Sequence, residues 1–490
     1  MLRISKKFLN DYNGNEKSCL QSYLSATEEY YRGNKDIIRF VKDEINVLRI
    51  LIGRGESAET VIKRLNYRAD TDFFRKNGRA YPLDTAAKLY PLVMGRYSSA
   101  IFRLSAWLRE DIYPEFLQCA LNRIQPRFPA FSAVLKKGVF WHYLDGYNGH
   151  CRVMRDGDVP CSQILMSGAR SVPFRVVYFK NRIGVEFFHA LTDGTGGLIF
   201  LKTLLGEYFR LLGISFSYTD QVLDVCDRAS EEELCDGFKQ VKSELAGGGM
   251  EERRAAPICG KLLYRRARVY HFILDAEKLK AKAKQCRVTV TALLTGYILR
   301  AGKDCTEGKG LLRVQIPVNV RKFYGLKTFS NCAMFACVEK DRECVSEDET
   351  FLSEIDRQLK ERTSKENMER SVVKACKMVQ ALNYIPLFLK RPAAQIYDKT
   401  VTKRSFTQTL SNLGVTCLPD GMAEHVEMLD FIIGSPSKNA GYLSSVTCNG
   451  KVVLSYTTTN RSRLFEEKLY EYLSEEKLVV KIYGGQNYAD

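Results

Sequence analysis

The first 75 residues place apolar side chains at spacings of three and four, which is the pattern of amphipathic helices. Two such stretches run from Ser18 to Tyr31 and from Ile37 to Ile52. Ser57 is a suitable N-cap for a further helix that ends near Leu65. We therefore expect residues 1–77 to form a helical extension, to which the pattern assigns no role.

After Pro82 the pattern alternates between extended and helical stretches. An apolar stretch over residues 99–108 predicts a strand, and residues 111–124 predict an amphipathic helix that tolerates Pro114 in its first turn. The apolar runs Phe174 to Phe179 and Ile183 to Phe188 flank a short polar turn and predict a β-hairpin. Helical spacing then covers residues 198–212.

Residues 216–262 differ from both of their flanks, because they contain an acidic run and a stretch of three glycines. Beyond them strand-like and helix-like stretches alternate again, with a long helix-rich region over residues 349–390 and four strands between residues 407 and 456. This order predicts an α/β fold with a first lobe over residues 78–225, a linker over 226–262 and a second lobe over 263–490.

Composition narrows the class of protein. The chain has 490 residues, of which 45% are hydrophobic, and its 15 cysteines include no Cys-x-x-Cys pair. No two of its five histidines share a metal-binding spacing, so we expect no metal site. Because no export signal is visible, we expect the cysteines to be reduced thiols. No secretory signal and no apolar stretch of about 18 residues is present, so we expect a cytoplasmic protein without a transmembrane segment.

The formal net charge of +17 favours an anionic partner, such as a phosphate-rich cofactor, an acidic carrier protein, a membrane surface or nucleic acid. No basic segment with interleaved aromatic residues resembles a nucleic-acid-binding module. We therefore rank nucleic-acid binding last and expect no nucleic-acid partner.

The most informative segment is His189-Ala190-Leu191-Thr192-Asp193-Gly194, which lies between a predicted strand and a predicted helix. An imidazole near its ordinary pKa of about 6.5 accepts a proton from an alcohol or amine at neutral pH. Asp193 supports the turn or orients His189, and Gly194 allows a tight turn. These residue types suit acyl transfer from a thioester, although a hydrogen-bonded core histidine gives the same local pattern.

This segment resembles the His-x-x-x-Asp-Gly signature of the chloramphenicol-acetyltransferase-like superfamily, which includes alcohol O-acetyltransferases and condensation domains. Residues 83–88 (LDTAAK) resemble the entry segment of its bacterial alcohol O-acetyltransferase-like branch. Residues 317–321 (PVNVR) resemble a Pro-x-x-x-Arg strand of the second lobe, and residues 411–414 (SNLG) resemble a strand that faces its tunnel. The resemblance covers roughly residues 78–490. Phe188 occupies the place of the first of two histidines in condensation domains, which favours simple ester or amide formation.

The resemblance implies two lobes of mixed sheet and helices with the active site in a tunnel between them. It implies an O-acyltransferase in which His189, Asp193 and Gly194 form the catalytic motif and Asp193 pairs with Arg321. Ser411 and Asn412 are candidates for stabilising the oxyanion or lining the tunnel. The implied co-substrate is acyl-coenzyme A, with an acetyl or other short acyl group, and no cofactor would stay bound. The candidate contacts for the coenzyme A phosphates are Arg265, Arg266 and Lys390.

Two alternatives share this fold. In the first, the donor is a thioester on an acyl carrier protein. In the second, the protein is catalytically silent and binds a lipid or a partner protein. The acceptor, which we expect to be a small molecule with a hydroxyl or an amine, is not specified by the sequence.

Overall fold

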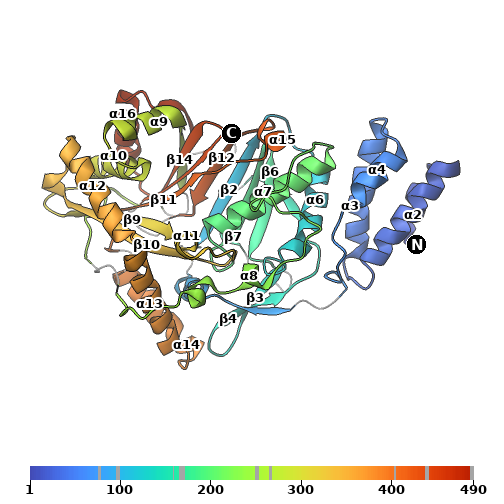
Figure 1. Ribbon diagram of the computed structural model, residues 1–490, viewed down its shortest axis with the longest axis horizontal. Coiled ribbons are helices and arrows are strands. Elements are labelled where there is room, and N and C mark those ends of the chain that lie inside the picture. Colours follow the sequence, from blue (N-terminus) through green and yellow to red (C-terminus); the bar gives the residue numbers. More distant parts are fainter. Residues whose placement is uncertain are drawn as a thin grey trace.

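The computed structural model describes residues 1–75, 79–94, 100–157, 159–164, 171–248, 253–263, 267–401, 404–435 and 441–485. Two large mixed sheets lie at its centre, and helices pack around them (Figure 1). This mixed α/β arrangement with two lobes is the fold class that the sequence predicts.

The first sheet has the strand order β12-β2-β7-β6-β5. Its strands are β2 (Ile101–Leu108), β5 (Val153–Arg155), β6 (Phe174–Phe179), β7 (Arg182–Phe188) and β12 (Val426–Ile433). The predicted hairpin is confirmed as β6 and β7, which pair antiparallel around a turn at Lys180 and Asn181. Helices α6 (Pro114–Ile124) and α7 (Gly194–Leu211) pack on each other beside this sheet.

Strand β12 comes from the predicted second lobe but pairs antiparallel with β2 of the first sheet. Nearly every residue of β12 is buried, so the strand adds apolar surface to the first-lobe core. The two lobes are thus joined by a shared sheet as well as by the connecting chain.

The second sheet has the order β10-β9-β11-β13-β14-β8-β15. Its strands are β8 (Arg268–Asp275), β9 (Leu311–Asn319), β10 (Ala333–Asp341), β11 (Gln408–Val415), β13 (Gly441–Cys448), β14 (Lys451–Thr458) and β15 (Val479–Gly485). The helices beside it are α9 (Ala276–Gln285), α10 (Val290–Asp304), α12 (Glu349–Arg362) and α16 (Leu464–Glu475). Their apolar faces share a second core with the sheet.

Four helices precede the first sheet: α1 (Arg3–Leu9), α2 (Gly14–Tyr30), α3 (Ile37–Gly53) and α4 (Ala58–Leu65). The predicted N-cap is confirmed, because Ser57 Oγ accepts a hydrogen bond from Thr60 N. These helices lie at one end of the molecule beyond α6 (Figure 1), and their apolar residues belong to the same core as the first sheet. The buried Glu44 carboxylate of α3 accepts from Arg123 of α6 at 3.0 Å. Because an ion pair without water is costly to separate, this contact fixes the helices to the lobe.

A three-stranded sheet, β1-β4-β3, lies below the first sheet in Figure 1. Its strands are β1 (Ala80–Pro82), β3 (Ala133–Lys137) and β4 (His142–Gly146). Helices α13 (Lys365–Ala381) and α14 (Leu387–Thr400) extend from the second lobe beside it. The remaining helices are short: α5 (Tyr90–Val93), α8 (Glu231–Leu234), α11 (Arg321–Tyr324), α15 (Asp420–Ala423) and 3-10 turns at Ala87–Leu89, Gln125–Arg127, Gly237–Gln240 and Arg342–Cys344.

Over the described ranges, the helices are all too short or too polar to cross a lipid bilayer. The same residues include no group of three or more His, Cys, Asp or Glu side chains placed to hold a metal ion.

Candidate active site

His189 lies directly after β7, at the point where the chain leaves the first sheet and turns into α7. Its backbone N–H donates to Ala100 O at 2.8 Å, which continues the pairing of β7 with β2 by one residue. Asp193 then caps α7, because its Oδ1 accepts from the N–H groups of Thr195 and Gly196 at 3.1 and 3.2 Å. The predicted order of strand, turn and helix around His189 is confirmed.

Gly196 is needed in this turn because the chain passes very close to the second lobe. A Cβ at this position would lie 2.2 Å from Thr192 Oγ1 and 2.6 Å from the carbonyl oxygen of Phe329. Thr192 Oγ1 itself donates to Phe329 O at 2.7 Å. A side chain at position 196 would therefore push the turn away from the second lobe.

Aromatic rings fix the plane of the His189 imidazole. The Tyr90 ring of α5 stacks on it with centroids 4.4 Å apart and planes at 15°, and Phe102 of β2 meets it edge-on at 5.1 Å. The imidazole is half-buried. Burial lowers the pKa of His189, against the opposing effects of its hydrogen bond to Asn331 and of the Asp193 charge. The neutral form is therefore favoured at neutral pH.

A chain of three polar side chains fixes which imidazole nitrogen carries the proton. Asn331 Nδ2 donates to the Asp84 carboxylate at 3.2 Å, so the Asn331 amide oxygen faces His189. His189 Nδ1 lies 2.9 Å from that oxygen and, in this arrangement, donates to it. In the neutral imidazole Nε2 is then the unprotonated nitrogen, which is the form that a general base requires.

Asp84 is a buried carboxylate. Burial raises the pKa of Asp84 to about 7, the Asp236 charge adds to this rise, and hydrogen bonds from Ala87 and Asn331 oppose it. Ala87 N donates to Asp84 Oδ1 at 2.6 Å.

Asp193 turns away from His189 and pairs with Arg321. Its Oδ2 lies 2.7 Å from Arg321 Nη1, and both side chains are buried. Burial alone would raise the pKa of Asp193, but the Arg321 guanidinium and the N–H groups of Cys332 and Gly196 hold it below its ordinary value. The resemblance of residues 317–321 placed Arg321 in a strand, and the structure differs. Arg321 begins the short helix α11 immediately after β9, because the pairing of β9 with β10 ends at Asn319.

Two carboxylates of the first lobe therefore hold one segment of the second lobe. Asp84 Oδ2 accepts from Asn331 N at 3.0 Å, and Asp193 Oδ2 accepts from the adjacent Cys332 N at 2.8 Å. These two bonds place the Asn331 side chain against His189. The geometry of the imidazole thus depends on contact between the lobes.

The other predicted site residues lie elsewhere around the motif. Ser411 and Asn412 are on β11, where Ser411 is buried and the Asn412 amide donates to Thr291 at 3.1 Å and accepts from Gly414 N. Gly194 begins α7, and a Cβ on it would lie 2.8 Å from Leu413 of the same strand. The motif and β11 are therefore neighbours.

Of the three expected phosphate contacts, Lys390 is the one that lies among the described residues. Arg265 and Arg266 lie outside the described residues. Lys390 is buried with its Nζ 3.3 Å from the centroid of the Trp141 ring. Burial, together with the nearby Lys88, lowers the pKa of Lys390 to about 8.

Sequence reasoning assigned no role to Asn331, Asp84 or Tyr90. Asp84 lies in a segment that the resemblance singled out, but its partner Asn331 is 247 residues away. Asn331 is in turn 142 residues from His189, so no local spacing could have revealed this chain of contacts.

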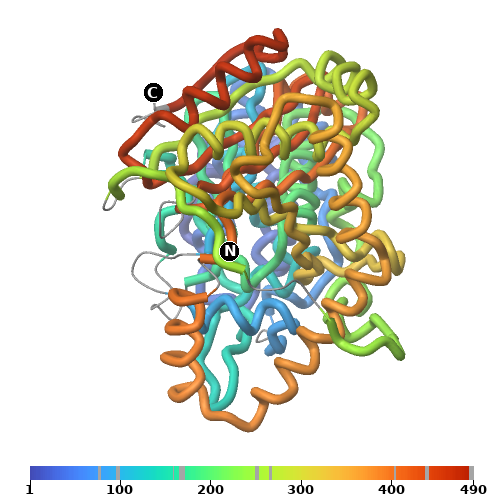
Figure 2. The backbone as a smooth tube through the Cα atoms, turned by 90° about the vertical axis from the view of Figure 1, so that its left-hand side faces the viewer, coloured from blue at the N-terminus to red at the C-terminus, as the bar shows by residue number. Residues whose placement is uncertain are grey.

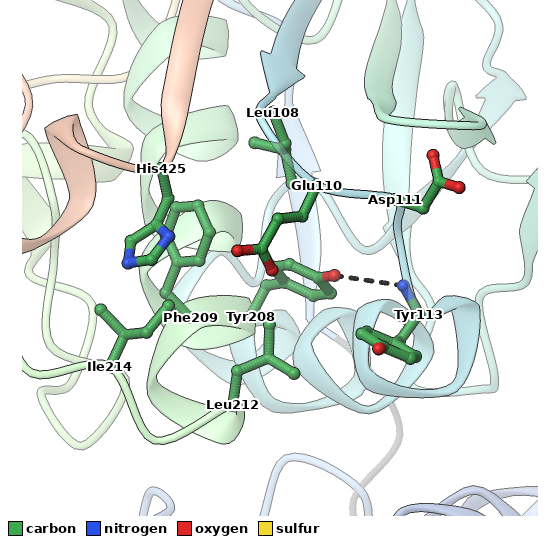
Figure 3. A pocket seen from close by; sticks show the side chains of 9 residues that line it. All are labelled: Leu108, Glu110, Asp111, Tyr113, Tyr208, Phe209, Leu212, Ile214 and His425. Atoms are coloured by element: carbon green, nitrogen blue, oxygen red, sulfur yellow. Dashed lines mark hydrogen bonds between the residues drawn. The ribbon is translucent and has the colours of Figure 1, made fainter.

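A small surface pocket lies elsewhere in the first lobe, between the end of β2, the start of α6 and the end of α7 (Figure 3). It is lined by Leu108, Glu110, Asp111, Tyr113, Tyr208, Phe209, Leu212, Ile214 and His425. Tyr113 N donates to Tyr208 Oη at 3.1 Å (Figure 3). The pocket contains none of the residues around His189.

The fold is shared with several solved structures. F. sporotrichioides TRI101 complexed with coenzyme A and T-2 matches with a TM-score of 0.56 and 13% identity, over 82% of this chain and 99% of that one. Polyketide synthase associated protein 5 from Mycobacterium tuberculosis matches with a TM-score of 0.53 and 13% identity, over 80% of this chain and 97% of that one.

The epimerization domain from the third module of tyrocidine synthetase B has the same TM-score of 0.53 at 12% identity, over 82% of this chain and 96% of that one. No family model and no curated protein sequence matches the chain. At these identities the likeness concerns the fold.

Proposed function

We propose that the protein is an acyltransferase that moves an acyl group from a coenzyme A thioester to a hydroxyl or amine, with His189 as general base. The observation that carries this proposal is the hydrogen bond from His189 Nδ1 to Asn331, which leaves Nε2 as the proton acceptor. Support for the donor comes from a shared fold with a protein solved with coenzyme A, and from the net charge of +17.

In the proposed reaction His189 Nε2 accepts the proton of the acceptor hydroxyl as its oxygen attacks the thioester carbonyl carbon. The tetrahedral intermediate collapses with cleavage of the C–S bond, and the imidazolium returns its proton to the departing thiolate. The thiolate is a good leaving group, so no covalent enzyme intermediate is required. The Asn331 oxygen stabilises the imidazolium while it carries the extra proton.

The remaining motif residues have supporting roles in this proposal. Asp193, Gly194 and Arg321 hold the turn and the second-lobe segment in place. The developing oxyanion requires a donor about 3 Å away, for which Ser411 and Asn412 are the candidates. The Asn412 amide is already held by Thr291 and Gly414, so Ser411 is the better of the two. We further propose a short acyl group and an alcohol acceptor, as in the bacterial alcohol O-acetyltransferase-like branch.

The test is thiol release by the purified protein from acetyl-coenzyme A and longer acyl-coenzyme A donors, with a panel of alcohols and amines. We expect release that depends on the acceptor, with the acylated acceptor detected by mass spectrometry. Release from carrier-bound thioesters alone would contradict the coenzyme A donor. Absence of acyl transfer from either kind of donor would contradict the enzymatic function and favour a binding role.

A further inference from the structure

A continuous strip of large apolar side chains is exposed to solvent along α14 and the turn between β3 and β4. The exposed residues of the strip, with their exposed fractions, are Val139 (72%), Phe140 (43%), Tyr384 (87%), Phe388 (74%), Leu389 (52%), Ile396 (64%) and Tyr397 (50%). An exposed apolar patch of this extent marks an interaction surface rather than a scatter of single residues.

The spacing along α14 makes the strip continuous. Phe388 and Leu389 are separated from Ile396 and Tyr397 by eight residues, and the exposed Pro392 and Ala393 lie midway between them. Steps of four residues follow one face of a helix, so these side chains form a single apolar face. The face points to solvent, which is the reverse of the amphipathic pattern expected for a helix that covers a core.

The β3–β4 turn extends this face. Leu387 N donates to Val139 O at 2.9 Å, so the turn and the start of α14 are bonded directly. Figure 2 shows the α13–α14 hairpin, in orange, beside the β3–β4 hairpin, in cyan, at the lower end of the molecule. Both hairpins end at this lower end of the molecule.

The inner side of α14 is held near the candidate active site. Gln395 Nε2 donates to Met94 O at 2.9 Å, immediately after helix α5. Helix α5 contains Tyr90, whose ring stacks on His189. The exposed apolar face is therefore separated from the candidate active site by little more than the thickness of these two helices.

The surroundings of the strip are basic. Lys137, Lys377, Arg391 and Lys399 are exposed beside it. On helix α14 itself two exposed bases, Arg391 and Lys399, accompany one acid, Asp398, whereas Lys390 is buried. A helix that combines large apolar residues with flanking Lys and Arg is typical of segments that lie in the surface of an anionic membrane.

We propose that α14 and the β3–β4 turn form a peripheral docking surface for a bilayer that contains anionic phospholipids. The aromatic and aliphatic side chains enter the headgroup region, and the surrounding bases contact the lipid phosphates. A second copy of the chain is a poorer occupant, because it would bring the same positive charge against this face. The proposal does not rest on acyl transfer.

The test is co-sedimentation of the full chain with vesicles of phosphatidylcholine alone, or of equal parts phosphatidylcholine and phosphatidylglycerol. We expect binding to the anionic vesicles that weakens with added salt, and little binding to the neutral ones. Phe388→Ser combined with Ile396→Ser should lower the partition coefficient of the protein into anionic vesicles by about 100-fold, since each apolar side chain contributes roughly tenfold. Lys377→Glu combined with Arg391→Glu should weaken it at low salt.

A matched control changes two equally exposed apolar residues elsewhere, Ile38→Ser with Val480→Ser, and should bind like the wild type. The substituted side chains are exposed, so every variant should melt within about 2 °C of the wild type. The proposal is overturned if the wild type does not bind anionic vesicles or binds neutral vesicles equally well. It is overturned too if the variant with both Phe388→Ser and Ile396→Ser binds anionic vesicles as strongly as the wild type. It is also overturned if these substitutions only dissociate a dimer that binds no vesicles.

Discussion

Replacing Asn331 by leucine removes the acceptor of the His189 Nδ1 proton while keeping a side chain that branches at the same atom. In the proposed reaction this 2.9 Å hydrogen bond strengthens when the imidazole becomes positively charged. Hydrogen bonds to charged groups contribute about 1.5–3 kcal/mol, and about 1.4 kcal/mol corresponds to tenfold in rate. We therefore expect Asn331→Leu to lower kcat by about 10- to 150-fold.

The pH profile gives this prediction a second measurement. The bond to Asn331 raises the pKa of His189, so its loss should lower that pKa and move the acid limb of kcat/KM to lower pH. The control is Asn122→Leu, which also removes a buried asparagine but lies in α6, where its amide donates to Asp43. The control should lose stability without moving the pH profile. An Asn331→Leu enzyme with wild-type kcat and an unmoved acid limb would refute the role assigned to Asn331.

Three further predictions concern stability. Arg321→Met leaves the buried Asp193 carboxylate without its ion partner and should lower the free energy of unfolding in urea by about 3–5 kcal/mol; a loss below about 1 kcal/mol would argue against this ion pair. Gly196→Ala should lower the free energy of unfolding by about 1–3 kcal/mol, because its Cβ meets Thr192 and Phe329. Gly53→Ala, at a helical position with open space, should not lower it. Equal effects of the two substitutions would contradict the close approach at Gly196. The pKa of Asp84 is about 7 in the folded protein, so the folded state holds the Asp84 proton more tightly than the unfolded chain does. The free energy of unfolding of the wild type, relative to that of Asp84→Asn, should therefore fall as pH rises from about 4 to 7, by up to about 1.4 kcal/mol per pH unit. An identical pH dependence in the two proteins would contradict the raised pKa.

The local elements around His189 could be predicted because their signals are local. The apolar run that ends at Phe188 and the helical spacing that follows Gly194 were sufficient to place a turn at the motif. The predicted N-cap of α4 was also found, since Ser57 accepts from Thr60 N. Strands β1, β4, β5 and β15 were not predicted; β1 and β5 have only three residues each, and β15 ends in two glycines.

The contacts that orient His189 could not be predicted, because they join residues that are far apart in the sequence. The bond between Asp84 and Asn331 forms only once both lobes have folded against each other. The pairing of β12 with β2 is equally remote, and nothing in the sequence of β12 shows which sheet it joins. The resemblance of residues 189–194 to a known signature supplied the general base candidate, whereas the tautomer of His189 depends on tertiary structure.

We propose that His189 is the base in acyl transfer. The most direct test is to measure thiol release by His189→Ala under conditions in which the wild type acylates an acceptor. The matched control is His425→Ala, which removes a histidine from the surface pocket of Figure 3. We expect a loss of about 10²- to 10⁴-fold in kcat for His189→Ala and wild-type activity for the control. Acyl transfer by folded His189→Ala at the wild-type rate would contradict the role of His189 as general base.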